Sequence, residues 1–351
     1  MALDTVAAGR AWIYSHNIGR RAAAGMGFNW PTNVAVGRDD RLFVANRTPH
    51  ISRVTVDQQF LGECGRQGQP GGDFVYLSAL ALDQDQNLYA ADEWLNEIRI
   101  FDEEGNYLRS WGEAGDGAGQ LSGPAGMLFD ADDNLWIVNS MNSRIQKFNK
   151  EGEYLGGFGV KGSAEGELDH PWGITIDNQG DIYIADWNNH LVKKFTTEGT
   201  LLRTFGSGRP MGVDPDGSTV YWHTLVDDIG VDPNDLNHPS GVAVDGDGDV
   251  YVTDWMNERV VIFDAEGTTL TTLRGDAHEL SEWAQLSMQA NPDMLRRRRQ
   301  AKHPEVSSYF RMPAHCVFDQ ANNRLIVCDT MRHRLQIYEK DDTYADPQYN
   351  L

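Results

Sequence analysis

The chain reads HPWGITIDNQGDIYIADWNNHLVKKFTTEGTLLRTFG from His170 to Gly206 and HPSGVAVDGDGDVYVTDWMNERVVIFDAEGTTLTTLRG from His238 to Gly275. These stretches are two copies of one pattern, and weaker copies recur along the chain in units of about 45 residues. Such a period is typical of repeat proteins, in which each unit buries its apolar face only against its neighbours. Six units can be counted, beginning near Phe28, Phe74, Leu121, Leu168, Leu236 and Phe310.

Each unit contains four short apolar runs separated by turns. In the fifth unit these runs are Gly241–Val244, Val250–Thr253, Val260–Phe263 and Leu270–Leu273. Runs rich in Val, Ile, Tyr and Phe between Gly, Asn and Asp are typical of strands joined by hairpins. Four strands per unit is the plan of a propeller blade, whereas a helical repeat would need longer runs with a 3.6-residue period. The pattern therefore predicts an all-β, six-bladed β-propeller of four-stranded blades.

Closure of the ring needs a fourth strand for the sixth blade. The last unit, Arg311–Lys340, supplies three strands, and the segment 11–18 (AWIYSHNI) has the composition of a strand that belongs to no unit. We expect segment 11–18 to complete the sixth blade, because closure removes an exposed sheet edge. The repeats would then make residues 1–351 a single propeller domain.

The repeated motifs resemble those of a known family. D-W-x-N-x-R-V at Asp254–Val260, the H-P-x-G starts and the D-x-x-G-x-x-L ends of the units resemble NHL repeats. The resemblance extends from about residue 11 to 340 and implies a six-bladed NHL propeller. It implies no single activity, because propellers host binding scaffolds, lyases, hydrolases and lactonases.

The blade architecture is also similar, more distantly, to that of peptidylglycine amidating lyases. The metal-binding histidines of those enzymes lie just past the Pro that begins an inner strand. In this chain only His315 has that placement, and the aligned positions Asn33, Gly126, Gly173 and Gly241 do not match. The resemblance therefore does not extend to the amidating activity.

Composition excludes several classes of partner. The 52 acidic and 30 basic residues give a net charge of −22, which would repel a phosphate backbone and argues against nucleic acid. The basic run Arg296–Arg299 indicates a solvated helix face. No apolar run is long enough for a membrane span, and no secretory signal is visible. Three cysteines are too few for a disulfide framework, so we expect a cytoplasmic protein with no membrane partner.

The spacing between units reveals two insertions. An aligned position recurs at intervals of 47, 47, 68 and 75 residues, at Asp92, Asn139, Asp186, Asp254 and Asp329. The extra residues fall in 207–235 and 276–309, and Asn291-Pro292-Asp293 predicts a helix start in the second insertion. Both insertions precede an inner strand, so we expect them over one face of the ring. Loops of this length are commonly lids or binding loops, and the alternative is a decoration or a subunit contact.

The same face should collect aromatic, Met, His and carboxylate side chains from several blades. This mixture suits a small, partly apolar ligand, since it combines stacking area with a few polar anchors. The alternative for each is structural: the repeated Asp can hold its loop and the repeated Trp can pack between blades. The candidate ligand-binding residues are Trp30, Asn33, His50, Trp94, Met141, Trp187, His223, Trp255 and Met331.

His315 departs from the repeat, because three of its aligned partners are Gly, and a departure from a repeat needs its own reason. We expect it to act as a base or a ligand, with Asp329 and Arg47 as catalytic partners. His315, His50 and His223 together could hold a divalent metal such as zinc with an open position.

A calcium loop is the other candidate cation site. Asp245, Asp247 and Asp249 resemble its start, but Gly stands at the fourth place and Met256 at the twelfth, which favours a hairpin turn.

Two functions follow from these patterns. The first is binding of a small organic molecule in a lidded central cavity, with metal- or His-assisted hydrolase or lyase chemistry. The alternative is a non-catalytic scaffold for a protein or peptide. The long insertions and His315 favour the first, and the incomplete set of metal ligands favours the second.

Overall fold

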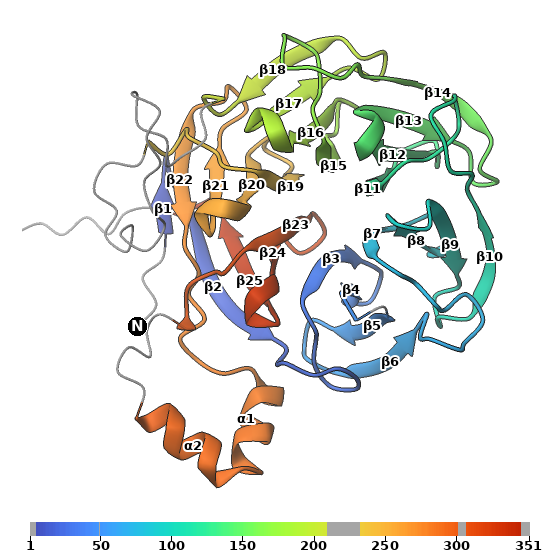
Figure 1. Cartoon of the computed structure of the whole chain (residues 1–351). Coiled ribbons are helices and arrows are strands. Elements are labelled where there is room, and N and C mark those ends of the chain that lie inside the picture. The colour runs from blue at the N-terminus through green and yellow to red at the C-terminus, as the bar shows by residue number, and fades with distance from the viewer. Residues whose placement is uncertain (1–4, 49, 209–231, 301–306, 345–351) are drawn as a thin grey trace, which may run out of the picture.

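The computed structural model describes residues 5–48, 50–208, 232–300 and 307–344. Its strands form six antiparallel sheets arranged around a common centre (Figure 1). The predicted six-bladed β-propeller is confirmed. None of the helices in these described ranges is long and apolar enough to cross a membrane.

The first five blades have four strands each, numbered from the centre outwards. Blade one is β3 (Pro31–Val36), β4 (Arg41–Asn46), β5 (His50–Thr55) and β6 (Phe60–Cys64), and blade two is β7 (Leu77–Leu82), β8 (Leu88–Asp92), β9 (Glu97–Phe101) and β10 (Tyr107–Trp111). Blade three is β11 (Pro124–Phe129), β12 (Leu135–Asn139), β13 (Arg144–Phe148) and β14 (Tyr154–Phe158). Blade four is β15 (Pro171–Ile176), β16 (Ile182–Asp186), β17 (Leu191–Phe195) and β18 (Leu201–Phe205). Blade five is β19 (Pro239–Val244), β20 (Val250–Asp254), β21 (Arg259–Phe263) and β22 (Thr269–Leu273).

Blade six closes the ring with strands from both ends of the chain. It contains β23 (Pro313–Asp319), β24 (Arg324–Asp329), β25 (Arg334–Asp341), β2 (Arg10–Ile18) and β1 (Thr5–Ala7), in that order. β2 pairs antiparallel with β25, with Ile18 opposite Leu335. The predicted closing strand is therefore found, and β1 adds a fifth strand that the repeat did not indicate.

The core lies between neighbouring blades. Tyr183 and Val192 of blade four, for example, share one apolar cluster with Val242 and Val252 of blade five. The middle strands are covered on both faces, which explains why β20 is buried at every position and reads as VYVTD without polar alternation.

The inner strands come close together near the centre. A Cβ on Gly173 would lie 2.8 Å from the Cα of Gly241, and a Cβ on Gly241 would lie 2.9 Å from the Cα of His315. These positions therefore face the next inner strand and tolerate only Gly. At the aligned position of blade one the joint is wider, and Asn33 Oδ1 accepts the Leu80 N–H at 3.2 Å. By the same register His315 lies at the joint between blade six and blade one.

The second insertion forms two helices, α1 (Glu282–Gln289) and α2 (Pro292–Arg299). The side chain of Asn291 accepts the Met294 N–H, which confirms the expected helix start. Both helices lie outside the ring, at its rim (Figure 1). The expectation that this segment covers the centre is therefore wrong for its described residues.

Trp283 explains the position of α1. It is buried among side chains of blades six and one, with its ring centroid 5.8 Å from that of Phe28 and 6.4 Å from that of Phe60. Its Nε1–H donates to the Gln58 carbonyl at 2.8 Å. Burial of this indole holds α1 at the rim. Most of the first insertion, residues 209–231, lies outside the described residues.

Candidate functional site

The top face is defined here as the face that carries the loops between second and third strands. In four blades this loop is a short 3-10 helix: η1 (Ser140–Asn142), η2 (Trp187–Asn189), η4 (Trp255–Asn257) and η6 (Thr330–Arg332). Each helix is followed by a residue in the left-handed region, such as His190 with φ 56° and His333 with φ 57°. The loops that lead into the inner strands lie on the same face and contact these turns.

The aligned acidic residue holds the loop that leads into its own inner strand. Asp254 Oδ1 accepts the Asn237 N–H at 2.6 Å, and its Oδ2 accepts from Arg259 at 2.7 Å. Asp329 does the same with the Arg311 N–H at 2.8 Å and with Arg334 at 2.7 Å. Burial raises the pKa of both carboxyls, and their arginine partners oppose that rise. This geometry favours a structural role for Asp329 over the expected catalytic one.

His190 and His333 link neighbouring blades, and the sequence pattern did not single them out. His190 Nδ1 accepts the His238 N–H at 3.2 Å, and His333 Nδ1 accepts the Trp30 N–H at 3.1 Å. The aligned Asn96 makes the equivalent bond to the Gly123 N–H at 2.7 Å. One signal was available in the sequence: this position carries a hydrogen-bond acceptor in every blade where it can be aligned.

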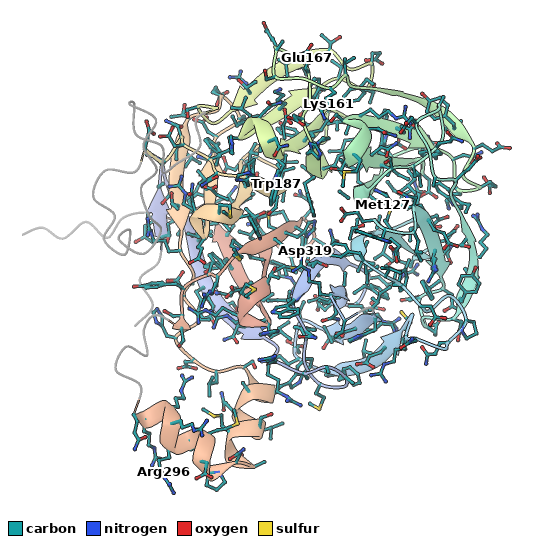
Figure 2. The ribbon with its side chains drawn as sticks, viewed as in Figure 1. Met127, Lys161, Glu167, Trp187, Arg296 and Asp319 are labelled. Carbon is teal, nitrogen blue, oxygen red and sulfur yellow. The ribbon has the colours of Figure 1, made fainter. Side chains whose placement is uncertain are left out.

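Four aromatic rings are in contact on the top face of blades four and five. The Trp187 ring centroid lies 5.1 Å from that of Trp172, 5.0 Å from that of Trp255 and 4.9 Å from that of His238. All four side chains are half-buried. We call Trp172, Trp187, Trp255 and His238 the aromatic patch. Figure 2 shows Trp187 beside the centre of the ring.

The Nδ1 atoms of two histidines in this region have close polar partners. His238 Nδ1 lies 2.8 Å from Asn237 Oδ1, and His170 Nδ1 lies 2.7 Å from Asp169 Oδ1. For His238, an Nδ1 proton donated to the Asn237 oxygen leaves the lone pair on Nε2, whereas His170 Nδ1 also lies 3.0 Å from Asn188 Nδ2. Burial lowers the pKa of His238, and burial together with the charge of His238 lowers the pKa of His190 to about 4. The rings of His190 and His238 are therefore neutral at pH 7.

Acidification should weaken the joint between blades four and five. The pKa of His190 is about 4 when folded, below its ordinary 6.5, so its contribution to stability is complete above about pH 6.5 and is lost as the pH falls towards 4. Protonation would also remove the acceptor of the His238 N–H. We expect His190→Asn, which keeps an acceptor, to show a smaller loss of melting temperature between pH 7 and pH 4.5. If the melting temperature falls equally in the native protein and in His190→Asn, His190 does not stabilise this joint.

The centre of the ring holds a narrow cavity of about 10 Å³, lined by the inner strands of five blades. This is space for about one water molecule. His315 lines it, and its buried Nδ1 has no hydrogen-bond partner among the described residues. Burial lowers the pKa of His315 to about 4. This one cavity, as the described residues line it, has room for a water molecule and not for an organic ligand.

The remaining candidate residues are dispersed. Arg47 is exposed and donates to the Tyr76 hydroxyl at 2.7 Å, and within the described residues no hydrogen bond or ion pair joins it to His315 or Asp329. His50 is buried on the third strand of blade one, where its Nε2 lies 3.5 Å from Glu63 Oε1. His315 is on the inner strand of blade six. His223 lies outside the described residues.

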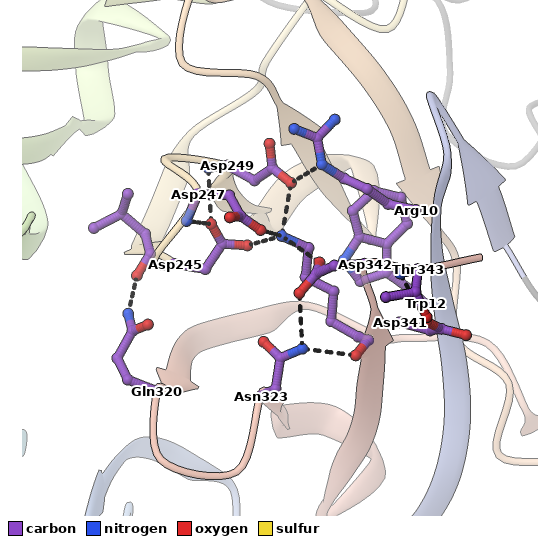
Figure 3. A network of polar contacts seen from close by, with 12 residues as sticks. Arg10, Trp12, Asp245, Asp247, Asp249, Gln320, Asn323, Asp341, Asp342 and Thr343 are labelled. Atoms are coloured by element: carbon purple, nitrogen blue, oxygen red, sulfur yellow. Dashed lines mark hydrogen bonds and ion pairs between the residues drawn. The ribbon is translucent and has the colours of Figure 1, made fainter. Parts of the chain in front are cut away.

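Metal ligands do not cluster where the structure can be described. Across residues 5–48, 50–208, 232–300 and 307–344, no three His, Cys, Asp or Glu side chains are close enough to hold a metal ion. The three aspartates that resemble a calcium loop instead surround the Nζ of Lys340, which lies 2.6 Å from Asp245, 2.8 Å from Asp247 and 3.0 Å from Asp249 (Figure 3). The ammonium group offsets part of the negative charge of this hairpin turn, as the hairpin interpretation allows.

The other predicted ligand-binding residues divide into two groups. Trp30 stacks on His333 with 5.9 Å between ring centroids, and Asn33 is buried in the joint between blades one and two. Trp94, Met141 and Met331 are exposed on the top face, with 75%, 53% and 37% of their surface accessible. Sequence reasoning included Trp187 and Trp255 of the aromatic patch and missed Trp172 and His238 as its members.

The blades with the aromatic patch also carry the family signature. The NHL repeat family matches residues 168–195 and 236–263, which contain the first three strands of blades four and five. The chain is a six-bladed β-propeller with NHL repeats in blades four and five. No curated protein sequence is similar enough to this propeller to count as a relative.

Solved structures of proteins with different functions share the propeller fold of this chain. A streptogramin B lyase is 10% identical with a TM-score of 0.58, covering 94% of this chain and 98% of its own. A gluconolactonase from Xanthomonas campestris is 15% identical with a TM-score of 0.56, covering 95% and 89%. A chain of a nidogen/laminin complex is 17% identical with a TM-score of 0.54, covering 76% and 93%. At these identities the likeness shows the fold alone.

Proposed function

We propose that this NHL propeller binds a small organic molecule with a planar apolar group at the aromatic patch. The observation that carries the proposal is the contact of Trp187 with Trp172, Trp255 and His238 across the joint of two blades. Half-buried indole rings offer stacking area that stays accessible to a ligand. The Nε2 atoms of His238 and His170 supply polar anchors beside this area.

Chemistry on the bound molecule is the second part of the proposal. The neutral imidazole of His238 can accept a proton at Nε2, as a general base in hydrolysis or elimination requires. Lyase and lactonase propellers of the same fold support this class of reaction. Binding and catalysis are separable, and the first experiment addresses binding.

Removal of the patch should abolish ligand binding. In a thermal-shift screen against a metabolite library, the double variant Trp187→Ala, Trp255→Ala should weaken any hit of the native protein by tenfold or more, because loss of ring stacking removes about 1.4 kcal/mol or more. Trp94→Ala is the matched control, since Trp94 is an exposed indole of the same face outside the patch. A hit that survives in the double variant, or a native protein without hits, would overturn the proposal.

A peptide scaffold is the second candidate, favoured by the exposed Trp94, Met141 and Met331 of blades two, three and six. Exposed aromatic and Met side chains are enriched at protein interfaces. If the propeller binds a displayed peptide, and Trp94→Ala with Met141→Ala removes that binding while the patch variant keeps it, the scaffold function replaces the first proposal.

A further inference from the structure

A cavity of about 230 Å³ lies at the rim, between blade six and the helices of the second insertion. Its walls come from the end of β2, the segment before α1, α2, η6 and the start of β25. Five of its twelve lining residues are arginines, and one is acidic, Glu279. We call this cavity the arginine pocket; its arginines are Arg20, Arg21, Arg298, Arg332 and Arg334.

This concentration of positive charge runs against the composition of the chain. The sequence has 52 acidic and 30 basic residues, so a random lining would be acidic on balance. Some arginines elsewhere in the described structure are paired with a carboxylate of their own blade, such as Arg259 with Asp254 at 2.7 Å. The lining of the arginine pocket therefore departs from the acidic composition of the chain, and a positively charged cavity suits an anion.

The pairing of the five arginines is incomplete. Arg334 binds Asp329 at 2.7 Å and the Ser308 carbonyl at 2.9 Å. In the part of the chain that the structure describes, no carboxylate lies within ion-pair distance of Arg20, Arg21 or Arg298. Like charges that share a cavity repel one another, and a bound anion relieves that repulsion.

Arg332 shows the effect of this crowding. Burial lowers the pKa of its guanidinium, Asp329 opposes that change, and the charges of Arg334 and Arg311 lower the pKa further. The charge of Glu258 also opposes the lowering of the Arg332 pKa.

We propose that the arginine pocket binds a small oxyanion, either a phosphate monoester or a dicarboxylate. Guanidinium groups bind both through paired N–H donors in a planar fork. The volume is below the range of about 300–1,000 Å³ that is usual for drug-sized ligands, which favours a small molecule. The anion would join three parts of the chain: α2 through Arg298, η6 through Arg332 and the segment after β2 through Arg20.

The helix α2 supplies a matched pair of variants. Arg298 lines the pocket, whereas Arg296 is two residues away, pairs with Asp293 at 3.6 Å and does not line it. Figure 2 shows Arg296 on the side of α2 that points away from the ring. Both side chains are exposed, so neither substitution to Ala should disturb folding.

The test is calorimetric titration of the whole chain with inorganic phosphate, and separately with succinate, at low ionic strength. We expect saturable binding of one or both anions by the native protein. Arg298→Ala should raise Kd about 10- to 100-fold, as the loss of charge-assisted hydrogen bonds implies, and Arg296→Ala should change it less than about twofold. Arg20→Ala, in a different wall, should weaken binding as Arg298→Ala does.

The two anions distinguish the sources of the ligand. Tighter binding of phosphate assigns a phosphate monoester, and tighter binding of succinate assigns a dicarboxylate. The proposal is overturned if the native protein binds neither anion, or if Arg296→Ala and Arg298→Ala weaken binding equally.

Discussion

Replacement of Lys340 by Met should lower the free energy of unfolding by about 3–5 kcal/mol, because it leaves buried carboxylates without their cation. The Nζ of Lys340 is fully buried and lies within 3.0 Å of four carboxylates, from Asp245, Asp247, Asp249 and Asp342. Arg10 is the second cation of the group, 3.0 Å from Asp249. Figure 3 shows these groups converging where blade five meets the closing strand.

The effect of Lys340→Met should depend on pH. Burial and the neighbouring Asp245 already raise the pKa of Asp249, with Lys340 opposing. Without the ammonium group the pKa rises further, so the variant loses more stability as the pH rises through that pKa and recovers some of it in acid. Urea denaturation at pH 5 and pH 8 measures the difference.

Lys147 is the control for a partly exposed pair. It lies 2.9 Å from Asp130, and 23% of its side-chain surface is accessible. Lys147→Met should cost about 1 kcal/mol or less. Equal urea midpoints for Lys340→Met and Lys147→Met would show that the buried cluster contributes nothing special.

Replacement of Trp283 by Ala should cost about 3–5 kcal/mol and loosen one joint of the ring. The indole is buried in a cluster with Phe28, Leu335 and Ile337, which joins blade one to blade six. Loss of a buried Trp removes its transfer free energy and leaves a cavity. Hydrogen exchange should therefore accelerate in blades one and six more than in blades three and four.

Leu286 offers a control on the same helix, since 57% of its surface is exposed. Leu286→Ala should change stability by less than about 0.5 kcal/mol. If Trp283→Ala speeds exchange evenly in all six blades, α1 does not secure the joint.

The propeller architecture could be predicted from the sequence, because the repeated units show the number of blades and strands directly. The fifth unit's runs at Val250–Thr253 and Val260–Phe263 coincide with β20 and β21, since hairpin spacing is a local property. The loop-holding role of Asp254 follows equally from its place in the repeat. Such positions are fixed by contacts inside one blade.

The candidate sites were harder to predict from the sequence, because they combine side chains from different blades. Trp172 and His238 fit the repeat and gave no signal as partners of Trp187, 15 and 51 residues away in the sequence. A helix in the second insertion was predicted, yet only the packing of Trp283 between blades six and one places α1 at the rim. Arg298 likewise belongs to a basic run that indicated a solvated helix face. In the structure, neighbouring segments lie beside Arg298, so that it lines a pocket.

The pairing of β2 with β25 has a consequence for biosynthesis. Residues 10–18 leave the ribosome early, but their partner strand, Arg334–Asp341, follows some 300 residues later. Until then the incomplete propeller has unpaired strand edges that can pair with other chains, as in other slow-folding β topologies. A nascent chain that is truncated before β25 would therefore leave β2 unpaired and exposed to aggregation or degradation. Only a fully translated chain can close the ring.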